Sequence, residues 1–409
     1  MDKENKEVKS ENESLFFGIK KNILFLGLVS FLTDVSSDMV YPLLPVFLTE
    51  VLHSSKVFVG LIEGVAESTA SLLKIFSGWF SDKIGKRKPI VILGYSLSSI
   101  SKPLLALVTS GWQVLFIRFG DRVGKGVRTS PRDALIAESS AENRRGASFG
   151  LHRAMDSAGA IIGPLLAFLL LPLLNKNYRH LFLLASIPAF FSVLVLFLWV
   201  KEIKIRKKES VISERKKGIS FDSKFKIFIL VVAIFTLGNS SDAFLFLRAK
   251  SLGVNLIFIP LLWGFFNLVY TLSSIPAGIL SDRIGRKKVI LLGFTVYGLA
   301  YLGFAFATQA LHIWVLFALY GIYYGISDGA LRAFVADLVK EEDKRGTAYG
   351  FYHGAVGLCA LPASLILGFL WQGFGAAVAF SFGAILAILA GMVFYFGLSE
   401  GKRKIENTK

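Results

Sequence analysis

The sequence Gly78-Trp-Phe-Ser-Asp82-Lys-Ile-Gly85-Lys-Arg-Lys88 returns 200 residues later as Gly278-Ile-Leu-Ser-Asp282-Arg-Ile-Gly285-Arg-Lys-Lys288. Two other pairs of segments keep nearly the same offset: Ser36-Ser37-Asp38 with Ser240-Ser241-Asp242, and Arg144-Arg145-Gly146 with Lys344-Arg345-Gly346. Because three separate landmarks share one spacing, we expect the chain to consist of two related halves.

The composition predicts a membrane protein. Hydrophobic residues make up 54% of the 409 positions and charged residues only 18%, whereas soluble domains carry about 25% charge. This balance excludes an ordinary soluble enzyme, a disordered chain, a nucleic-acid-binding domain and a disulfide scaffold, and Cys359 is the single cysteine. Apolar runs long enough to span a bilayer are predicted at about 22–48, 57–80, 89–109, 112–135, 147–171, 180–200, 226–247, 256–280, 288–308, 312–337, 347–371 and 375–398.

The net charge of +17 is concentrated in alternate loops. The longest polar stretch, 201–226, holds ten Lys or Arg against four Asp or Glu. By the positive-inside rule, this linker and both termini are expected in the cytoplasm, with the protein in the cell membrane. We therefore expect an all-α integral membrane protein with twelve transmembrane helices, in which a parallel pseudo-twofold repeat relates two six-helix halves. The predicted parts are a tail at 1–21, halves at 22–200 and 227–398, the linker between them and a tail at 399–409.

The paired loops resemble the loop signature of the major facilitator superfamily, and the resemblance covers nearly the whole chain. In that family, the aspartate of the loop and its basic neighbours form a cytoplasmic gate between helices. The resemblance implies that the gate residues here are Gly78, Asp82, Gly85, Arg87, Gly278, Asp282, Gly285 and Arg286. Arg132 and Asp133, near the cytoplasmic end of the fourth run, are added to the gate by their position.

The fifth run carries a second pattern, Gly150, Gly159, Gly163 and Pro164. Its spacing resembles the antiporter signature of the drug:proton exporters of this superfamily, although Ala167-Phe168 stands where the family pattern ends in glycine. The same glycines also suit a helix that packs tightly against a neighbour, with a proline kink. A third pattern, Arg118-Phe-Gly-Asp121-Arg122-Val-Gly124, resembles a family pattern whose arginine is linked to proton movement.

Ionisable side chains inside the predicted spans are functional candidates, because charge within a bilayer costs at least a few kcal/mol. Two adjacent carboxyls in a dry site repel each other when both are ionised, so one of them can carry a proton in one state and release it in another. Asp38 and Glu67 are the leading candidates for proton coupling, followed by Asp34 and Glu63, with Arg118 as their partner. Permanent salt bridges between helices are the alternative.

Other polar side chains in the spans are candidates for the substrate cavity. Tyrosines there can present ring faces and hydroxyls to an organic molecule, although tyrosines also anchor helices at the membrane interface. The candidates are Asp121, Arg122, His152, Arg153, Asp156, Asp242, Asn267, Tyr270, Tyr323, Tyr324 and His353. Neither a cofactor nor a metal site is implied.

These patterns favour a secondary transporter that exports a small organic molecule in exchange for protons and functions as a monomer in the lipid bilayer. The alternatives are a proton symporter that imports an organic anion, and an exporter of a divalent metal or metal chelate. A membrane enzyme or sensor on a transporter frame is disfavoured, because the sequence shows neither a nucleophile elbow nor a nucleotide-binding loop. No nucleic-acid partner is expected.

Overall fold

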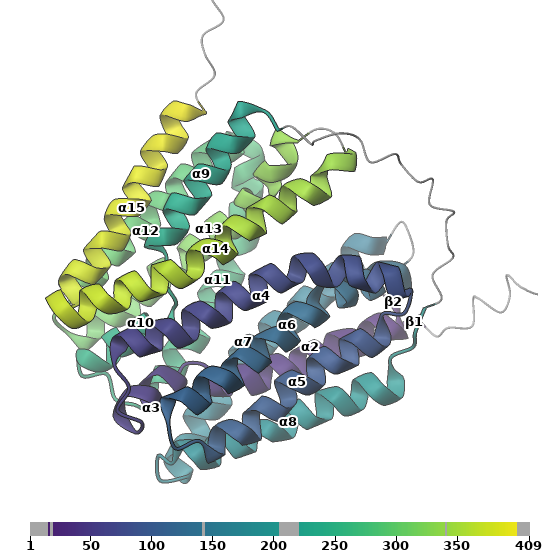
Figure 1. Cartoon of the computed structure of the whole chain (residues 1–409), viewed down its shortest axis with the longest axis horizontal. Coiled ribbons are helices and arrows are strands. Elements are labelled where there is room, and N and C mark those ends of the chain that lie inside the picture. Colours follow the sequence, from purple (N-terminus) through teal and green to yellow (C-terminus); the bar gives the residue numbers. More distant parts are fainter. Residues whose placement is uncertain (1–14, 17–18, 141–143, 204–220, 340–341, 399–409) are drawn as a thin grey trace, which may run out of the picture.

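The computed structural model describes residues 15–16, 19–140, 144–203, 221–339 and 342–398 (Figure 1). A short antiparallel pair, β1 (Leu15–Phe16) and β2 (Ile19–Lys20), precedes the helices. The helices of the first half are α2 (Lys21–Val40), α3 (Leu44–Glu50), α4 (Lys56–Ile84), α5 (Lys88–Leu107), α6 (Gly111–Ser139), α7 (Arg145–Leu173) and α8 (Tyr178–Trp199). Those of the second half are α9 (Ser223–Gly238), α10 (Ala243–Ser251), α11 (Phe258–Ile284), α12 (Arg286–Phe306), α13 (Ala310–Leu338), α14 (Glu342–Phe374) and α15 (Ala376–Gly397).

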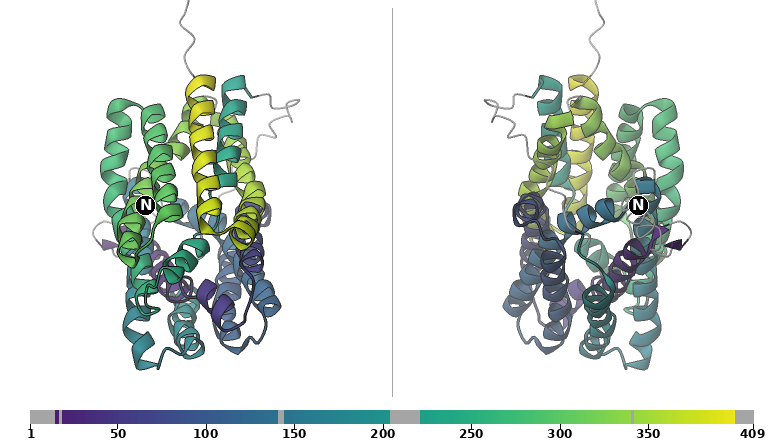
Figure 2. Two further views of the ribbon diagram at one scale, coloured as in Figure 1. Left: turned by 90° about the vertical axis from the view of Figure 1, so that its left-hand side faces the viewer. Right: turned by 90° about the vertical axis from the view of Figure 1, so that its right-hand side faces the viewer.

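The two sets of helices form two separate groups in space (Figures 1 and 2). In the first group α2 packs against α7 and α8, and α6 packs against α4 and α5. In the second group α11 packs against α13, and α12 packs against α13 and α15. The groups meet where α4 lies along α14 and where α7 lies along α11. Any site between them is therefore built from segments that are far apart in the sequence.

The chain is a multi-pass membrane protein by the length and composition of its helices. Within the described ranges, ten helical segments are long and apolar enough to cross a bilayer. The helices α4 and α6 are as long as the others, at 29 residues each, but are not among these ten. The stripe of charged side chains on α6 lowers its hydropathy. Many large apolar side chains, such as Phe76, Leu173 and Phe396, are exposed on the outside, as expected for lipid contact.

Two predicted spans are broken in the middle. The first divides into α2 and α3, since residues 41–43 form a turn that contains Pro42, which has no backbone N–H to donate to a helix. The seventh divides into α9 and α10 at Asn239-Ser240-Ser241-Asp242, residue types that favour helix caps over helix interiors. The side chains of Asp38 and Asp242 lie beside these breaks, at the junction of the halves. Backbone groups that a broken helix leaves without helical hydrogen bonds can bind a ligand, so discontinuous helices are common at transporter binding sites.

The halves are in close contact at one end and apart at the other. We call the end with the loops after α4 and α11, which contain Gly85 and Gly285, the basic end, and the other end the closed end. At the closed end Gly60 and Gly64 of α4 lie directly against α14, because a Cβ atom on Gly60 would come within 2.4 Å of the Ser364 carbonyl oxygen. Toward the basic end α4 and α14 diverge (Figure 1), and an apolar groove lined by Ile75 and Phe351 opens there.

The predicted tails and linker lie mostly outside the described residues, so their boundaries remain predictions.

Candidate functional site

Two adjoining cavities lie at the junction of the halves. The first, which we call the α6 cavity, has a volume of about 210 Å³ and is lined mainly by α2, α5 and α6. Its charged lining residues are the acids Asp34, Asp38, Glu67, Asp121 and Asp242 and the bases Lys102, Arg118, Arg122, Lys125 and Arg128. Most side chains that the sequence singles out for proton coupling therefore lie around one space.

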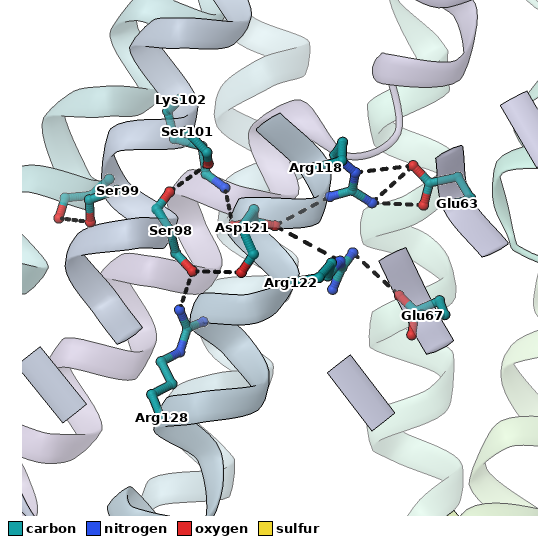
Figure 3. Close-up of polar contacts among 11 residues, drawn as sticks. Glu63, Glu67, Ser98, Ser99, Ser101, Lys102, Arg118, Asp121, Arg122 and Arg128 are labelled. Atoms are coloured by element: carbon teal, nitrogen blue, oxygen red, sulfur yellow. Dashed lines mark hydrogen bonds and ion pairs between the residues drawn. The ribbon is translucent and has the colours of Figure 1, made fainter. Parts of the chain in front are cut away.

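A buried ion pair joins α4 to α6. Arg118 donates from Nη2 to both carboxylate oxygens of Glu63, at 2.9 and 2.7 Å, and from Nε to Oε1 at 3.2 Å (Figure 3). The side chains are 7% and 1% exposed, so each charge depends on the other for the interactions that water would supply. Glu63 lies behind the cavity wall, in the interhelical salt bridge that the sequence leaves open as the alternative to proton coupling.

Asp121 is the centre of a second buried network. Its carboxylate lies 3.4 Å from Lys102 Nζ, 3.5 Å from Arg118 Nη1 and 3.9 Å from Arg122 Nε (Figure 3). Arg122 also reaches Glu67, at 3.4 Å. The Glu67 side chain is 45% exposed, whereas that of Glu63 is 1% exposed. Glu67 therefore faces the open part of the site and Glu63 does not.

Lys102 was not a candidate from the sequence, although a lysine within the apolar run 89–109 is a signal in itself. Helical phasing does not single it out, since Lys102 has no phased charged partner on its own helix. The structure supplies that partner from α6, in the form of Asp121.

The helix α2 presents two aspartates to the α6 cavity, one turn apart. Asp38 accepts a hydrogen bond from the indole nitrogen of Trp263 on α11, at 3.0 Å, so this contact crosses from one half to the other. Behind the aspartates, Gly159 and Gly163 of α7 pack directly on α2. A Cβ atom on Gly159 would lie 2.6 Å from the Phe31 carbonyl oxygen and 3.0 Å from Asp34 Cβ, and one on Gly163 would lie 3.2 Å from Asp38 Cβ.

The glycine pattern of the fifth run therefore sets the position of the aspartates. Pro164 continues the same surface toward Gly264 of the other half, where a Cβ atom would lie 3.4 Å from Pro164 Cβ. Gly150 differs, since a Cβ atom there would have no neighbour within 4 Å among the described residues.

The second cavity, which we call the tyrosine cavity, has a volume of about 300 Å³ and lies mainly in the second half. Its rings and carboxylates include Tyr41, Phe235, Phe294, Tyr323, Tyr324, Tyr352, Glu67, Asp242 and Asp328. Tyr41, Glu67 and Asp242 line both cavities, which joins them into one site. Asp242 accepts a hydrogen bond of 2.6 Å from the hydroxyl of Tyr320 on α13. Tyr320 is not among the residues predicted from the sequence, because its partner belongs to a different helix.

Six predicted cavity residues line neither cavity: His152, Arg153, Asp156, Asn267, Tyr270 and His353. Arg153 and Tyr270 instead link the halves, since Arg153 donates from Nη2 to the Tyr270 hydroxyl, which in turn donates to Asp328 at 3.0 Å. His152 Nδ1 lies 3.6 Å from Asp156 on the same helix. Asn267 donates to the Trp263 carbonyl of its own helix.

The predicted gate residues form contacts within each half. Arg87 pairs with Glu138 at 3.0 Å and Arg286 pairs with Asp337. Arg132 pairs with its neighbour Asp133 at 2.8 Å.

The glycines and aspartates of the loop motif have different surroundings. Gly85 and Gly285 have φ of 70° and 91°, a region that favours glycine at a helix end. A Cβ atom on Gly78 would be in ordinary contact with Ser130, and one on Gly278 would meet nothing within 4 Å in the described part. Asp282 is exposed, and the side chain of Asp82 lies outside what the structure describes.

Within the described ranges, no three His, Cys, Asp or Glu side chains gather in a group that could hold a metal ion. Glu67, Asp121 and Asp328 instead pair with arginine or lysine. Asp38 accepts a hydrogen bond from Trp263, and Asp242 accepts one from Tyr320.

A charged cavity between two groups of membrane-spanning helices defines a membrane transporter for small molecules. The chain belongs to the Major Facilitator Superfamily, whose family model matches residues 26–266 and 227–409. It is 40% identical, over 96% of its length, to an uncharacterized MFS-type transporter of Methanocaldococcus jannaschii, of which 98% is covered.

Two further comparisons extend this result. The chain is 26% identical to the multi-drug resistance efflux pump PmrA of Streptococcus pneumoniae, over 76% of this chain and 79% of the pump. Its fold is similar to that of the nucleoside transporter NupG, with a TM-score of 0.78 and 14% identity over 92% of this chain and 100% of that structure. At this identity the second likeness concerns the fold alone.

Proposed function

We propose that this protein exports a small organic molecule in exchange for protons by alternating access. The observation that carries the proposal is the joined cavity between the halves, where Asp38, Glu67 and Asp242 face a common space. The antiporter-like glycine pattern and the similarity to an efflux pump support the direction of transport.

In this proposal the chain crosses the membrane twelve times. The helices α4 and α6 count as spans because each is as long as its neighbours and packs within the first group. The breaks after α2 and α9 occupy corresponding places in the two halves, which supports a parallel repeat. By the positive-inside rule, the lysines and arginines of the basic end support a cytoplasmic position for that end and for both termini, with the protein in the cell membrane. The cavities then face the cytoplasm, the side from which an exporter takes its substrate.

The coupling step uses the Asp38–Trp263 hydrogen bond. An ionised carboxylate accepts a stronger hydrogen bond than a protonated one, so proton binding at Asp38 weakens a contact between α2 and α11. Because these helices belong to different halves, the protonation state of Asp38 biases how the halves sit against each other. Glu67 acts in the same space on α4, and the Arg118–Glu63 pair holds α4 to α6 during the movement.

The proposal is tested in proteoliposomes that carry a pH gradient, with ethidium as the transported organic cation. We expect protons to cross the membrane in the direction opposite to ethidium, and we expect Asp38→Asn to abolish the transport of both. The matched control is Asp222→Asn, because Asp222 is an exposed helix cap outside the cavity and asparagine caps a helix as well as aspartate does. Proton-coupled transport that survives in Asp38→Asn would remove this carboxyl from the mechanism.

A second candidate is proton symport of an organic anion into the cell. The five lysine and arginine side chains that line the α6 cavity favour it. A gradient that is acidic outside should then drive accumulation inside right-side-out vesicles, whereas an exporter loses substrate from the same vesicles.

A further inference from the structure

Three side chains, those of Tyr41, Glu67 and Asp242, line both cavities and therefore stand at the passage between them. Two of the three are held by a polar partner. Glu67 lies 3.4 Å from Arg122, and Asp242 accepts a hydrogen bond of 2.6 Å from Tyr320. Tyr41 carries the largest side chain of the three, so the width of the passage depends most on where its ring lies.

The Tyr41 ring is held by side chains from both halves. It packs edge-on against the ring of Phe246 on α10, with centroids 5.8 Å apart, and lies 5.3 Å from the Trp263 ring on α11. Aromatic rings attract each other at such distances. From the first half, the guanidinium carbon of Arg118 lies over the Tyr41 ring, 5.8 Å from its centroid, which is within the range of a cation–π contact. These three contacts keep the ring in the passage.

Each cavity is small when it is taken separately. The volumes are about 300 Å³ for the tyrosine cavity and about 210 Å³ for the α6 cavity, whereas sites for drug-sized molecules have about 300–1,000 Å³. A molecule that is too large for one cavity therefore has to extend past Tyr41 into the other. Moving the ring aside would break its contacts with Phe246 and Trp263.

We infer that Tyr41 is a specificity-determining residue that limits the size of the transported molecule. Its ring divides the joined site, so that a ligand is confined to one cavity in this state. Since Phe246 and Trp263 belong to the second half, their hold on the ring depends on how the halves sit against each other. This inference rests on the proposed function, because it treats the two cavities as the substrate site, and it adds the residue that sets the size limit.

The test measures the binding of two organic cations to the purified protein by isothermal titration. The probes are methyltriphenylphosphonium and tetraphenylphosphonium, which carry the same charge and differ by a methyl group against a phenyl group. The ratio of their dissociation constants therefore reports selection by size and not by charge. In Tyr41→Ala we expect this ratio to shift in favour of tetraphenylphosphonium by at least about tenfold, because a single methylene group in an apolar pocket already changes selectivity by about 10–200-fold.

Two further variants at the same position separate this effect from a folding defect. Tyr41→Phe keeps the ring, so it should keep the ratio of the wild-type protein. Tyr41→Trp places a larger ring in the passage, so it should shift the ratio the opposite way. Tyr349→Ala is the matched control, because Tyr349 lines neither cavity, and it should leave the ratio unchanged.

An unchanged ratio in Tyr41→Ala would overturn the inference, as would an equal shift in Tyr324→Ala. Tyr324 lines only the tyrosine cavity, so an equal shift would mean that cavity volume, and not the ring at the passage, sets the limit. Failure of both cations to bind the wild-type protein would overturn it too. Because this assay uses neither ethidium nor a proton gradient, an unchanged ratio leaves proton-coupled ethidium transport untouched, which separates the two failures.

Discussion

Replacing Gly163 by alanine should disturb both the stability and the transport activity of this protein. The added Cβ atom would lie 2.5 Å from the Val35 carbonyl oxygen, 3.1 Å from Val35 Cα and 3.2 Å from Asp38 Cβ. Since carbon–oxygen contacts are normally about 3.3 Å or longer, α2 and α7 must separate locally by roughly 0.8 Å. The obstacle is backbone, which no change of side-chain rotamer relieves. Overpacking of this kind costs about 1–3 kcal/mol.

The assay compares Gly163→Ala with Gly150→Ala, which lies on the same helix but would place its Cβ atom in open space. Alanine at Gly150 gains helix propensity, so its apparent Tm should stay equal or rise slightly. For Gly163→Ala we expect the apparent Tm in detergent to fall by about 2 °C or more. Proton-coupled transport should fall as well, because Asp38 moves with α2.

Equal Tm and equal transport for the two alanine variants would refute the reasoning. It would mean that the α2–α7 contact is loose enough to absorb a methyl group, so that the glycines do not set the position of Asp38.

Two other predictions follow from contacts between helices. Glu63→Gln should destabilise the protein by up to about 3–5 kcal/mol, because the buried Arg118 loses its closest carboxylate and keeps only Asp121, at 3.5 Å. The double variant with Arg118→Met should recover part of the apparent Tm, and an additive further loss would show that Glu63 and Arg118 are not coupled. Gly60→Ala places a Cβ atom 2.4 Å from the Ser364 carbonyl oxygen at the closed end, so it should favour the state in which that end opens and the basic end closes. In a protein without the native cysteine, thiol labelling of Ser71→Cys from the cytoplasmic side should then be slower. An unchanged labelling rate would contradict this.

Much of the architecture could be predicted from the sequence, because hydrophobicity and charge act locally. The apolar runs mark the helices, since a lipid-facing backbone must satisfy its own hydrogen bonds. The repeated loop of Gly78 and Gly278 predicts the family. The breaks after Val40 and Gly238 were not predicted, because both lie inside runs that remain apolar on average.

The site was predicted only in part, for a related reason. Helical phasing locates charges that share one face of one helix, as Asp34 and Asp38 do. It does not show which helix faces which, so it missed Lys102 and Tyr320, whose partners Asp121 and Asp242 come from other helices. It also grouped Glu63 with Glu67, although one is 1% and the other 45% exposed.

The sequence by itself determined that this chain is a helical membrane protein of a known transporter family. It also determined that ionisable side chains, whose burial in a bilayer costs free energy, lie within the spans of its first half. Those properties depend on the transfer of each segment between water and lipid, which composition controls. Only the tertiary structure decided which charges neutralise one another and which stay available. Arg118 is bound to Glu63, whereas Lys125 and Asp242 have no partner of opposite charge within the described residues. The reason is that pairing falls steeply with distance, and the distances between helices are set by packing, above all where Gly159 and Gly163 let α7 approach α2.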